Sequence, residues 1–296
     1  MKKDWQTYEP KDLSLGVFHS LMLAAVGPRP IAFVSSVNTE GQPNLAPFSF
    51  FNAFGSNPAT LVFSPARRGK DNTTKHTLHN VEATGECVIN VVNYSMVEQA
   101  SLASTDFPED VNEFIKAGFT EVPSQFVKPP RVGESPAAFE CKVLDIIKMG
   151  TEGGAGNLVI CEILALHYDS TVMTADGKVD QFKMDLVGRM GYEYYCRAFE
   201  PSIFEVPKPR TKNIIGFDGL PAEIRASEFL TGNELSRLAN CLEIPPVETI
   251  FELQKQIEST QPNEGFWLSE ARNCLKANHT DLAWAYLFKA YPTLGN

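Results

Sequence analysis

The stretch IAFVSSVNTEGQPNLAPFSFF, residues 31–51, contains two short apolar runs with turn residues between them. Ile31 to Val37 forms the first run and Leu45 to Phe51 forms the second. Between them, Asn38-Thr39-Glu40-Gly41 has the composition of a tight turn, because Asn and Gly tolerate the left-handed backbone that such turns use. The stretch therefore predicts two neighbouring β-strands joined by a turn.

Similar short apolar runs, interrupted by Gly, Pro and Asn, continue from about residue 28 to residue 200. The runs are not separated by the regular helical crossovers that a parallel α/β sheet requires. The predicted fold class is therefore mainly β, an antiparallel barrel or sandwich. The further predicted strands are Thr60 to Phe63, Glu86 to Val92, Ala138 to Met149 and Asn157 to His167.

Helical segments interrupt these strands, and two of them are followed by a glycine, a residue that commonly ends a helix. The prolines in Val122 to Pro136 indicate an extended loop instead. The predicted helical inserts are Asn72 to Thr84, Met96 to Ser104 and Asp110 to Ala117.

The pattern changes to helical periodicity after Pro201, Pro207 and Pro209. Four helices are expected there: one opened by a capping box at Thr231-Gly232-Asn233-Glu234 and running through Leu242, one opened by Pro245 and Pro246, one marked by Leu268, Ala271 and Leu275, and one capped by Thr280. We therefore divide the chain into a β domain, residues 1–210, and a small α-helical C-terminal extension, residues 211–296.

Charge and composition exclude several classes of protein. The net charge of −10 and the pI near 5.1 argue against a nucleic-acid-binding protein, which needs a basic face. No apolar run approaches the roughly 20 residues that span a bilayer, and residues 1–10 lack the apolar core of a secretory signal. The six cysteines are scattered without a CxxC motif, so we expect them to be reduced. A cytoplasmic protein with no membrane partner is expected.

A basic segment at residues 66–75, ARRGKDNTTK, is the strongest local anomaly. Four basic residues and one acid give +4 − 1 = +3 in a chain of net charge −10. The segment leads into a predicted helix start, where free backbone N–H groups favour anions. Together with its hydroxyl groups, this segment suits a phosphate dianion. The alternative is a solvated basic loop before an ordinary helix start.

A second anomaly is the phenylalanine-rich segment NLAPFSFFNAFGSNP, residues 44–58. Backbone groups and the side chains of Ser49 and Asn52, beside a flat apolar surface, would suit a planar heteroaromatic ligand. The alternative is a core strand whose phenylalanines are simply buried.

Other candidate chemistries carry less weight. His76, His79 and Glu82 could share a helical face, but this set is incomplete as a metal site, and no metal is expected. His167 is expected to be a hydrogen-bonded packing residue. The acids Asp106, Glu109, Asp110 and Glu113 have the pattern of an ordinary solvated helix start.

Several segments, taken in order, resemble the flavin reductase-like, FMN-binding split-barrel family, which includes flavoredoxin. The resemblance covers roughly residues 15 to 200, and Ile215 to Asn233 is similar to an extension found in some members. The segments that carry it are Arg29 to Ser36, Asn44 to Asn52, Ser64 to Thr77, Pro129 to Val132, Gly156 to Val159 and Val187 to Gly191.

This resemblance implies a six-stranded Greek-key split barrel that forms a homodimer, with FMN near the subunit interface. It implies that the Phe48 to Asn52 segment lies along the isoalloxazine and ribityl chain, and that Arg67 to Thr77 holds the phosphate. The cofactor-binding residues expected on this basis are Phe48, Ser49, Phe50, Phe51, Asn52, Arg67, Arg68, Asn72, Thr73, Thr74, Lys75 and Thr77.

The function implied by the resemblance is that of an NAD(P)H-dependent flavin reductase, in which NADH or NADPH delivers hydride to N5 of FMN. Alternatives are an FMN-binding electron carrier without NAD(P)H turnover and a barrel that has lost its cofactor. No acid–base residue is required, and Arg189 is the one catalytic candidate, the alternative being a structural ion pair. Tyr192, Tyr194 and Tyr195 would cover the ring or close the core. A monooxygenase or another electron acceptor is an expected partner.

Overall fold

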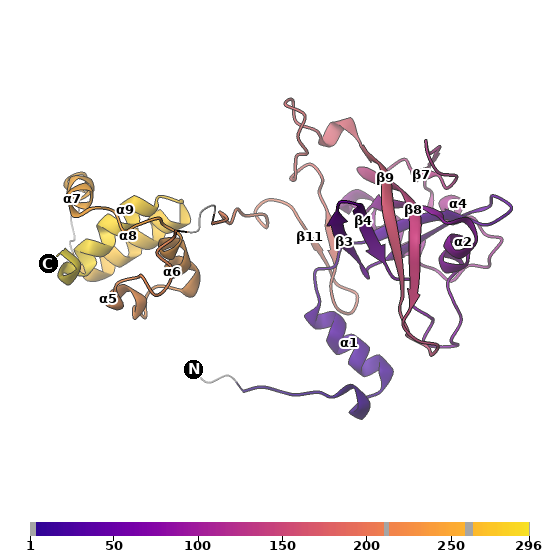
Figure 1. Ribbon diagram of the computed structural model, residues 1–296, viewed down its shortest axis with the longest axis horizontal. Coiled ribbons are helices and arrows are strands. Elements are labelled where there is room, and N and C mark those ends of the chain that lie inside the picture. Colours follow the sequence, from indigo (N-terminus) through magenta and orange to yellow (C-terminus); the bar gives the residue numbers. More distant parts are fainter. Residues whose placement is uncertain (1–3, 210–212, 258–262, 296) are drawn as a thin grey trace. The chain divides into compact units, whose positions relative to one another are not determined.

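The computed structural model describes residues 4–209, 213–257 and 263–295. The chain divides into two compact units, Met1–Phe204 (unit 1) and Glu205–Asn296 (unit 2) (Figure 1). The boundary expected from the sequence, between residues 210 and 211, lies outside the described residues.

Unit 1 is built on a seven-stranded sheet in which every neighbouring pair is antiparallel. This confirms the mainly β fold class, although the sheet has seven strands and not the six that the resemblance implies. The strand order is β2-β1-β5-β8-β9-β4-β3. The strands are β1 (Ala32–Val37), β2 (Pro43–Phe48), β3 (Phe51–Ser56), β4 (Ala59–Phe63), β5 (Glu86–Val91), β8 (Ala137–Lys148) and β9 (Asn157–Tyr168).

The β1–β2 turn forms as the sequence predicts. The Asn38 side chain accepts hydrogen bonds from the backbone N–H groups of Glu40, at 3.0 Å, and Gln42, at 2.9 Å. Gly41 has a φ of 84°, which a residue with a side chain rarely adopts. Local turn chemistry therefore sets the register of this hairpin.

The single strand predicted over Leu45 to Phe51 is wrong, and the difference closes the barrel. The segment forms two strands, β2 and β3, which lie at opposite ends of the sheet order and are separated only by Ser49 and Phe50. Such a link spans at most about 11 Å, whereas a flat sheet of seven strands is about 29 Å across. The sheet must therefore curl until its two edges approach each other, which gives the split barrel.

Helices and short strands complete unit 1. Helix α2 starts four residues later than predicted, at His76, because residues 72–75 form a loop in which Asn72 has a φ of 57°. Glycines in the left-handed conformation, Gly85 and Gly118, follow α2 and α4 as predicted. The elements are helices α1 (Leu15–Ala25), α2 (His76–Thr84), α3 (Val97–Leu102) and α4 (Glu113–Ala117) and the two-stranded pairs β6 (Glu121–Val122) with β7 (Arg131–Val132) and β10 (Val187–Arg189) with β11 (Tyr195–Arg197).

The inward faces of the strands form the core of the barrel. Val34, Phe63 and Ile89 are fully buried, and Phe48 packs on Phe63 with ring centroids 5.6 Å apart. A second cluster, under α3 and α4, is centred on Phe33, whose ring meets that of Phe119. Burial of an aromatic or branched side chain stabilises the fold by about 1.5–3 kcal/mol, so these strands are held mainly by apolar packing.

Buried Glu140 fastens the proline-rich loop to β8. Its carboxylate accepts hydrogen bonds from the backbone N–H groups of Gln125 (2.8 Å), Phe126 (2.5 Å) and Val127 (3.2 Å). Nε2 of His167, on β9, lies 2.8 Å from the same carboxylate. His167 is thus a hydrogen-bonded packing residue, as predicted.

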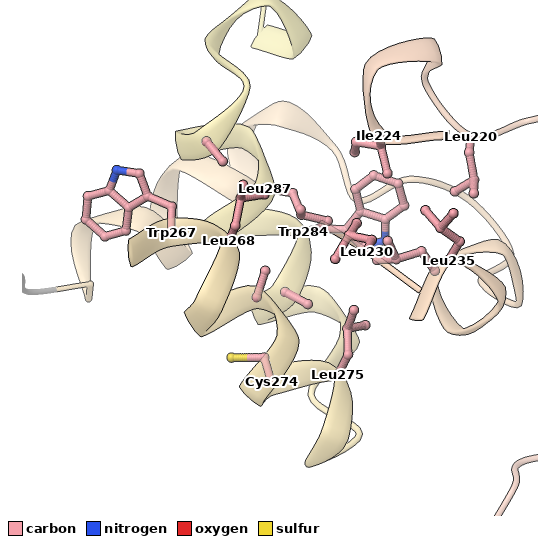
Figure 2. Packing of buried hydrophobic residues seen from close by; sticks show 14 of the residues in the cluster. Leu220, Ile224, Leu230, Leu235, Trp267, Leu268, Cys274, Leu275, Trp284 and Leu287 are labelled. Carbon is pink, nitrogen blue, oxygen red and sulfur yellow. The ribbon is translucent and has the colours of Figure 1, made fainter. Parts of the chain in front are cut away.

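Unit 2 is an α-helical bundle whose core includes Trp284 and Leu287 of α9 and Leu268 and Leu275 of α8 (Figure 2). The capping box at Thr231 and Glu234 is confirmed, although its helix ends at Ala239 rather than Leu242. Thr280 is the first helical residue, and not the cap that the sequence predicts. The helices are α5 (Ala222–Arg225), α6 (Gly232–Ala239), α7 (Val247–Lys255), α8 (Glu264–Lys276) and α9 (Thr280–Ala290).

All six cysteines are free in the structure, four of them buried. Among the residues that the structure describes, no helix has the length and apolar character needed to cross a membrane.

Candidate functional site

The basic segment forms a fixed loop between β4 and α2. The backbone N–H of Arg67 donates to the carbonyl of Ala155 at 2.9 Å, which attaches the loop to the β8–β9 connection. The backbone N–H of Arg68 donates to the carbonyl of Thr73 at 2.8 Å, and Nε of Arg67 donates to Oδ1 of Asn72 at 2.6 Å. These bonds close residues 67–73 into a compact turn, so Arg67 and Asn72 shape the loop.

An open pocket of about 670 Å³ lies beside this loop. Of the residues expected to hold a phosphate, the structure brings Arg67, Arg68, Asn72, Thr73 and Thr74 to its wall. The remaining lining residues are Lys70, Asp71, His76, His79, Asp106, Phe107 and Glu109.

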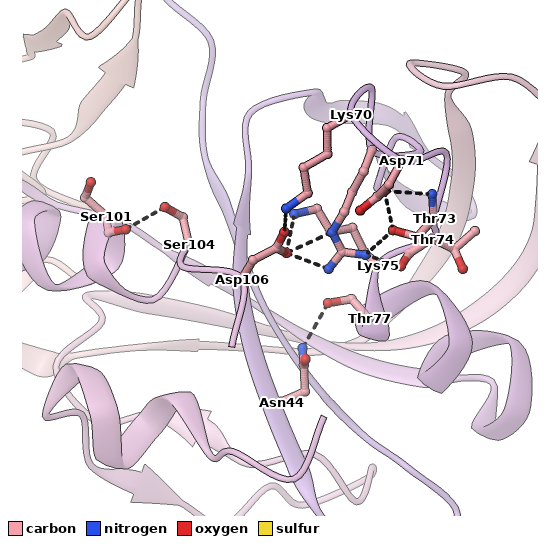
Figure 3. A network of polar contacts seen from close by, with 11 residues as sticks. Asn44, Lys70, Asp71, Thr73, Thr74, Lys75, Thr77, Ser101, Ser104 and Asp106 are labelled. Atoms are coloured by element: carbon pink, nitrogen blue, oxygen red, sulfur yellow. Dashed lines mark hydrogen bonds and ion pairs between the residues drawn. The ribbon is translucent and has the colours of Figure 1, made fainter. Parts of the chain in front are cut away.

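Three cations converge on a single carboxylate of this pocket, that of Asp106 (Figure 3). Two of them, Arg68 and Lys70, line the pocket, whereas Lys75 is not one of its lining residues. Arg68 donates from Nε at 2.8 Å and from its NH2 nitrogen at 2.6 Å. Nζ of Lys70 lies 2.7 Å from the carboxylate and Nζ of Lys75 lies 3.5 Å from it. We call Arg68, Lys70 and Lys75 the cationic cluster.

The cationic cluster stabilises the charged form of Asp106. Hydrogen bonds from Arg68, and then from Lys70, hold the pKa of the Asp106 carboxyl well below its usual range. The interpretation of Asp106 as an ordinary solvated acid is therefore wrong. The same interpretation is wrong for Glu113, for a different reason. Glu113 is buried and accepts a hydrogen bond from the backbone N–H of Leu45 at 3.0 Å, and burial raises its pKa.

The first turn of α2 adds backbone donors next to the cluster. Lys75 occupies the N-cap position, and its side chain makes no capping hydrogen bond. An uncapped helix start leaves backbone N–H groups and a partial positive charge facing outward. Thr77, in contrast, is 1% exposed and accepts a hydrogen bond from Asn44 at 2.9 Å, away from the pocket wall.

A smaller pocket, of about 190 Å³, lies at the bend between β2 and β3. Ser49 from the bend lines it, together with Arg189 and Tyr195, two candidates from the sequence analysis. The lining residues are Ile31, Pro47, Ser49, Val97, Ala100, Ser101, Ser104, Arg189 and Tyr195.

The other residues of the Phe48 to Asn52 segment do not line this pocket. Phe48 is buried in the barrel core, and Phe51 packs against the same core. The Phe50 ring meets His19 edge-on with centroids 6.2 Å apart. Asn52 is exposed, and its side chain accepts from the N–H of Ala53 at 2.8 Å. The bend therefore places Ser49 alone of the five on the pocket wall.

Arg29 connects the segments around the smaller pocket through hydrogen bonds. It is 5% exposed, and its guanidinium donates to the carbonyls of Leu23 (2.9 Å), Val26 and Met190 (2.8 Å). Its Nε lies 3.4 Å from Oγ of Ser49. Burial, and then the nearby Arg189, lower the pKa of Arg29. This residue, which sequence reasoning did not assign to a site, connects α1, β10 and the β2–β3 bend.

Arg189 is not held in an ion pair among the described residues. Its guanidinium stacks on the ring of Tyr195 at 4.6 Å and donates to the carbonyl of Tyr194 at 3.3 Å. Tyr192, Tyr194 and Tyr195 are 67%, 72% and 41% exposed, so the expectation that they close the core is wrong.

Three site residues that sequence reasoning missed come from the region of α3. Ser101 and Ser104 line the smaller pocket, and Asp106 follows two residues later in the larger one. Ser101 lies in the last turn of α3, and the signal for the other two in the sequence is the polar run that follows this helix. The histidine set has other contacts: His79 meets Thr74, and Glu82 pairs with Lys148. Within the described ranges, no group of three or more His, Cys, Asp or Glu side chains is placed to hold a metal ion.

Comparison with known proteins matches the β unit. Residues 26–183 match the flavin reductase like domain. An uncharacterized protein of Aquifex aeolicus is 36% identical over 189 residues, covering 64% of this chain and 94% of the relative.

Two solved structures are similar at the level of the fold and of the sequence. Nitrilotriacetate monooxygenase component B from Bacillus cereus has a TM-score of 0.64 and 25% identity, covering 69% of this chain and all of that chain. The 2-nitrobenzoate 2-nitroreductase NbaA of Pseudomonas fluorescens has a TM-score of 0.61 and 30% identity, covering 68% of this chain and 96% of that chain. Because the domain match extends over more than half of the chain and includes the bend at Ser49 and the cationic loop, this chain belongs to the flavin reductase-like family.

Proposed function

We propose that this protein binds FMN and acts as an NAD(P)H-dependent flavin reductase. The observation that carries the proposal is the cationic cluster, which faces an open pocket in a chain of net charge −10. A phosphomonoester is the anion that such a set of donors suits, because Arg and Lys make charge-assisted hydrogen bonds and the α2 start adds backbone donors.

The residues present fit FMN at the phosphate end. The three cations of the cluster would bind the phosphate, Arg68 and Lys70 from the pocket wall and Lys75 from beside it. Thr73 and Thr74 supply hydroxyl groups on the same wall. Arg67 and Asn72 hold the loop shape, since they are bonded to each other. We do not assign Thr77 a direct contact, because its hydroxyl is buried against Asn44.

At the smaller pocket, Ser49, Ser101, Ser104 and Arg189 offer hydroxyl and guanidinium donors. When bound, the flavin supplies the hydride-accepting and electron-donating chemistry. The protein then needs donors for negative charge on the ring and surfaces that orient it, and none of the pocket's lining residues is a carboxylic acid or a histidine. Arg189 would be the charged donor, and Arg29 positions it.

The proposal also includes a homodimer. Long strands β8 and β9 expose Leu144, Ile147, Leu164, Leu166 and Tyr168, each between 39% and 47% exposed. Helix α1, whose sequence LGVFHSLMLAA is largely apolar, buries none of its residues. Apolar surfaces of this extent on soluble proteins mark contact sites, and a second copy of this chain is the occupant we propose.

Leu164→Glu with Leu166→Glu should convert the dimer into a monomer, because two charges would be buried in an apolar contact. Light scattering after size exclusion should give twice the 32.7 kDa chain mass for the wild type and the single mass for the variant. Ile115→Glu, at an apolar position on α4 that is still more exposed (77%), is the control and should leave the dimer intact. A monomeric wild type, or a variant that remains dimeric, would contradict this arrangement.

The central test is flavin binding followed by turnover. Titration of the purified chain with FMN should quench the flavin fluorescence with one FMN per chain, and the loaded protein should oxidise NADH or NADPH with free flavin as acceptor. Binding without oxidation would leave the electron-carrier function instead. A chain that takes up no FMN would contradict the proposal altogether.

The physiological acceptor is proposed by similarity alone. One of the two similar structures is named as a component of a monooxygenase and the other as a nitro-group reductase. We propose a monooxygenase or another electron-accepting partner for this chain.

A further inference from the structure

The anion that neutralises the cationic cluster comes from the protein itself. Asp106 accepts three hydrogen bonds shorter than 3.0 Å from Arg68 and Lys70. These are the distances and the bond types that a phosphate oxygen makes with Arg and Lys. Asp106 and a bound phosphomonoester would therefore compete for the same donors.

Arg68 is more buried than Asp106, so Asp106 can leave Arg68 favourably only when another anion takes its place. The Arg68 side chain is 13% exposed, whereas that of Asp106 is 36% exposed. A largely buried guanidinium left without an anion is strongly disfavoured. Asp106 can turn outward into solvent, because it lies in the loop between α3 and α4 and belongs to neither helix. Arg68 then requires a new anion at the same place.

The two other acids in this pocket are placed differently. The Asp71 carboxylate accepts hydrogen bonds from the backbone N–H and the hydroxyl of Thr73, at 3.0 and 2.7 Å, and so closes a local turn. Glu109 lines the pocket, but it has no ion pair in the part of the chain that the structure describes. Asp106 is therefore the acid whose charge is coupled to the cationic cluster by contact.

We propose that Asp106 is a resident counter-ion, which the phosphate of FMN displaces from Arg68 and Lys70, and that this exchange lowers the affinity for FMN while leaving the cluster selective for dianions. The inference rests on the proposed function, because it takes the pocket to be the phosphate site. A dianion attracts the cluster more strongly than the single charge of a carboxylate, so a phosphomonoester can complete the exchange where a monoanion cannot.

Protonation does not offer another route for the exchange. An ordinary aspartate carboxyl is already ionised at neutral pH, with or without a cationic partner. While Asp106 is paired, hydrogen bonds from Arg68, and then from Lys70, hold its pKa lower still. The displaced carboxylate therefore remains a nearby negative charge that repels the bound phosphate.

Asp106→Asn tests the inference, since it keeps the shape and removes the charge. It should tighten FMN binding by at least about tenfold, because two like charges a few ångströms apart no longer oppose each other. Riboflavin, which lacks the phosphate, should bind the variant and the wild type equally. Inorganic phosphate should also compete with FMN at a lower concentration in the variant.

Glu109→Gln is the matched control: it removes one charge from the same pocket without breaking an ion pair of the cluster, and it should change the FMN affinity by less than about threefold. Asp106→Ser is a second variant if Asp106→Asn does not fold, as judged by circular dichroism.

Three results of these titrations would contradict the role proposed for Asp106 or the proposed function beneath it. If the wild type binds FMN and neither Asp106 variant binds it more tightly, Asp106 is not a competing counter-ion. An equal gain in FMN affinity in Glu109→Gln would also overturn the inference. The net negative charge of the pocket would then explain the gain without a contact between Asp106 and the cluster. If neither the wild type nor the Asp106 variants bind FMN, the proposed function fails first.

Discussion

Arg68→Ala combined with Lys75→Ala should weaken FMN binding by about 3–6 kcal/mol, since a hydrogen bond to a charged group contributes about 1.5–3 kcal/mol. This corresponds to a loss of affinity of roughly 10²- to 10⁴-fold. The loss exceeds that of a surface ion pair because Arg68 is largely buried and both side chains point at one place in the pocket. Fluorescence titration with FMN measures it directly.

Riboflavin separates the phosphate contact from a general loss of structure. Its affinity should be the same in the double variant and in the wild type, because riboflavin does not reach the cationic cluster. Lys178→Ala is the protein control: Lys178 forms an exposed ion pair with Asp176 at 2.6 Å, away from the pocket lining. Equal losses for FMN and riboflavin, or no loss for either, would contradict the assignment of the phosphate site.

Glu140→Gln should destabilise unit 1 by about 3 kcal/mol or more, because an amide group would face backbone N–H donors that now meet a carboxylate. Breaking a buried charged pair by removal of one partner typically costs about 3–5 kcal/mol. Urea unfolding followed by far-ultraviolet circular dichroism measures the change. Glu134→Gln is the control, because the exposed Glu134 also accepts hydrogen bonds from a loop residue, Thr120.

The two units give this experiment an internal reference. Two of the three tryptophans, Trp267 and Trp284, are buried in unit 2, whereas Trp5 of unit 1 is 79% exposed and its surroundings change little on unfolding. The unfolding transition seen by tryptophan fluorescence should therefore not move in Glu140→Gln. A shift of that transition, or a change in stability no larger than that of Glu134→Gln, would show that the Glu140 contacts do not anchor unit 1.

The loss of stability caused by Glu140→Gln should also depend on pH. Burial raises the pKa of Glu140, but the N–H donors of the loop and His167 outweigh this, and the pKa lies below its ordinary value of 4.5. The carboxylate therefore contributes its full stability above about pH 4.5, and the contribution is lost as the pH falls through the lowered pKa. The difference between the wild type and the variant should shrink in that acid range.

Local features of the chain were predictable because they depend on neighbours in sequence. The turn at Asn38 to Gly41, the capping box at Thr231 and the glycines after α2 and α4 each involve residues within a few positions of one another. Apolar runs identified six strand segments for the same reason, since a strand shows its buried face every second residue. The start of α2 was misplaced because Asn72 adopts a left-handed conformation that propensity does not reveal.

The site was only half visible in the sequence. The basic segment contains Arg68, Lys70 and Lys75, so its charge was evident, and so was its position before a helix. Its counter-ion was not, because Asp106 lies 38 residues from Arg68 and meets it only through the path of the α3–α4 loop. The pattern of acids around Asp106 is the same whether they are solvated or paired.

The sequence by itself determined that this is a mainly β chain with a helical extension, free thiols and an exceptional basic loop, because spacing, turn chemistry and charge act over short range. The tertiary structure decided where one predicted strand divides at Ser49 and which of its aromatic residues are buried. It also decided that Arg29 connects the segments around the smaller pocket and that Asp106 lines the larger one. The physical reason is that both outcomes depend on segments distant in sequence: a two-residue bend brings the edges of a seven-stranded sheet together, and the α3–α4 loop carries Asp106 to Arg68, 38 residues away.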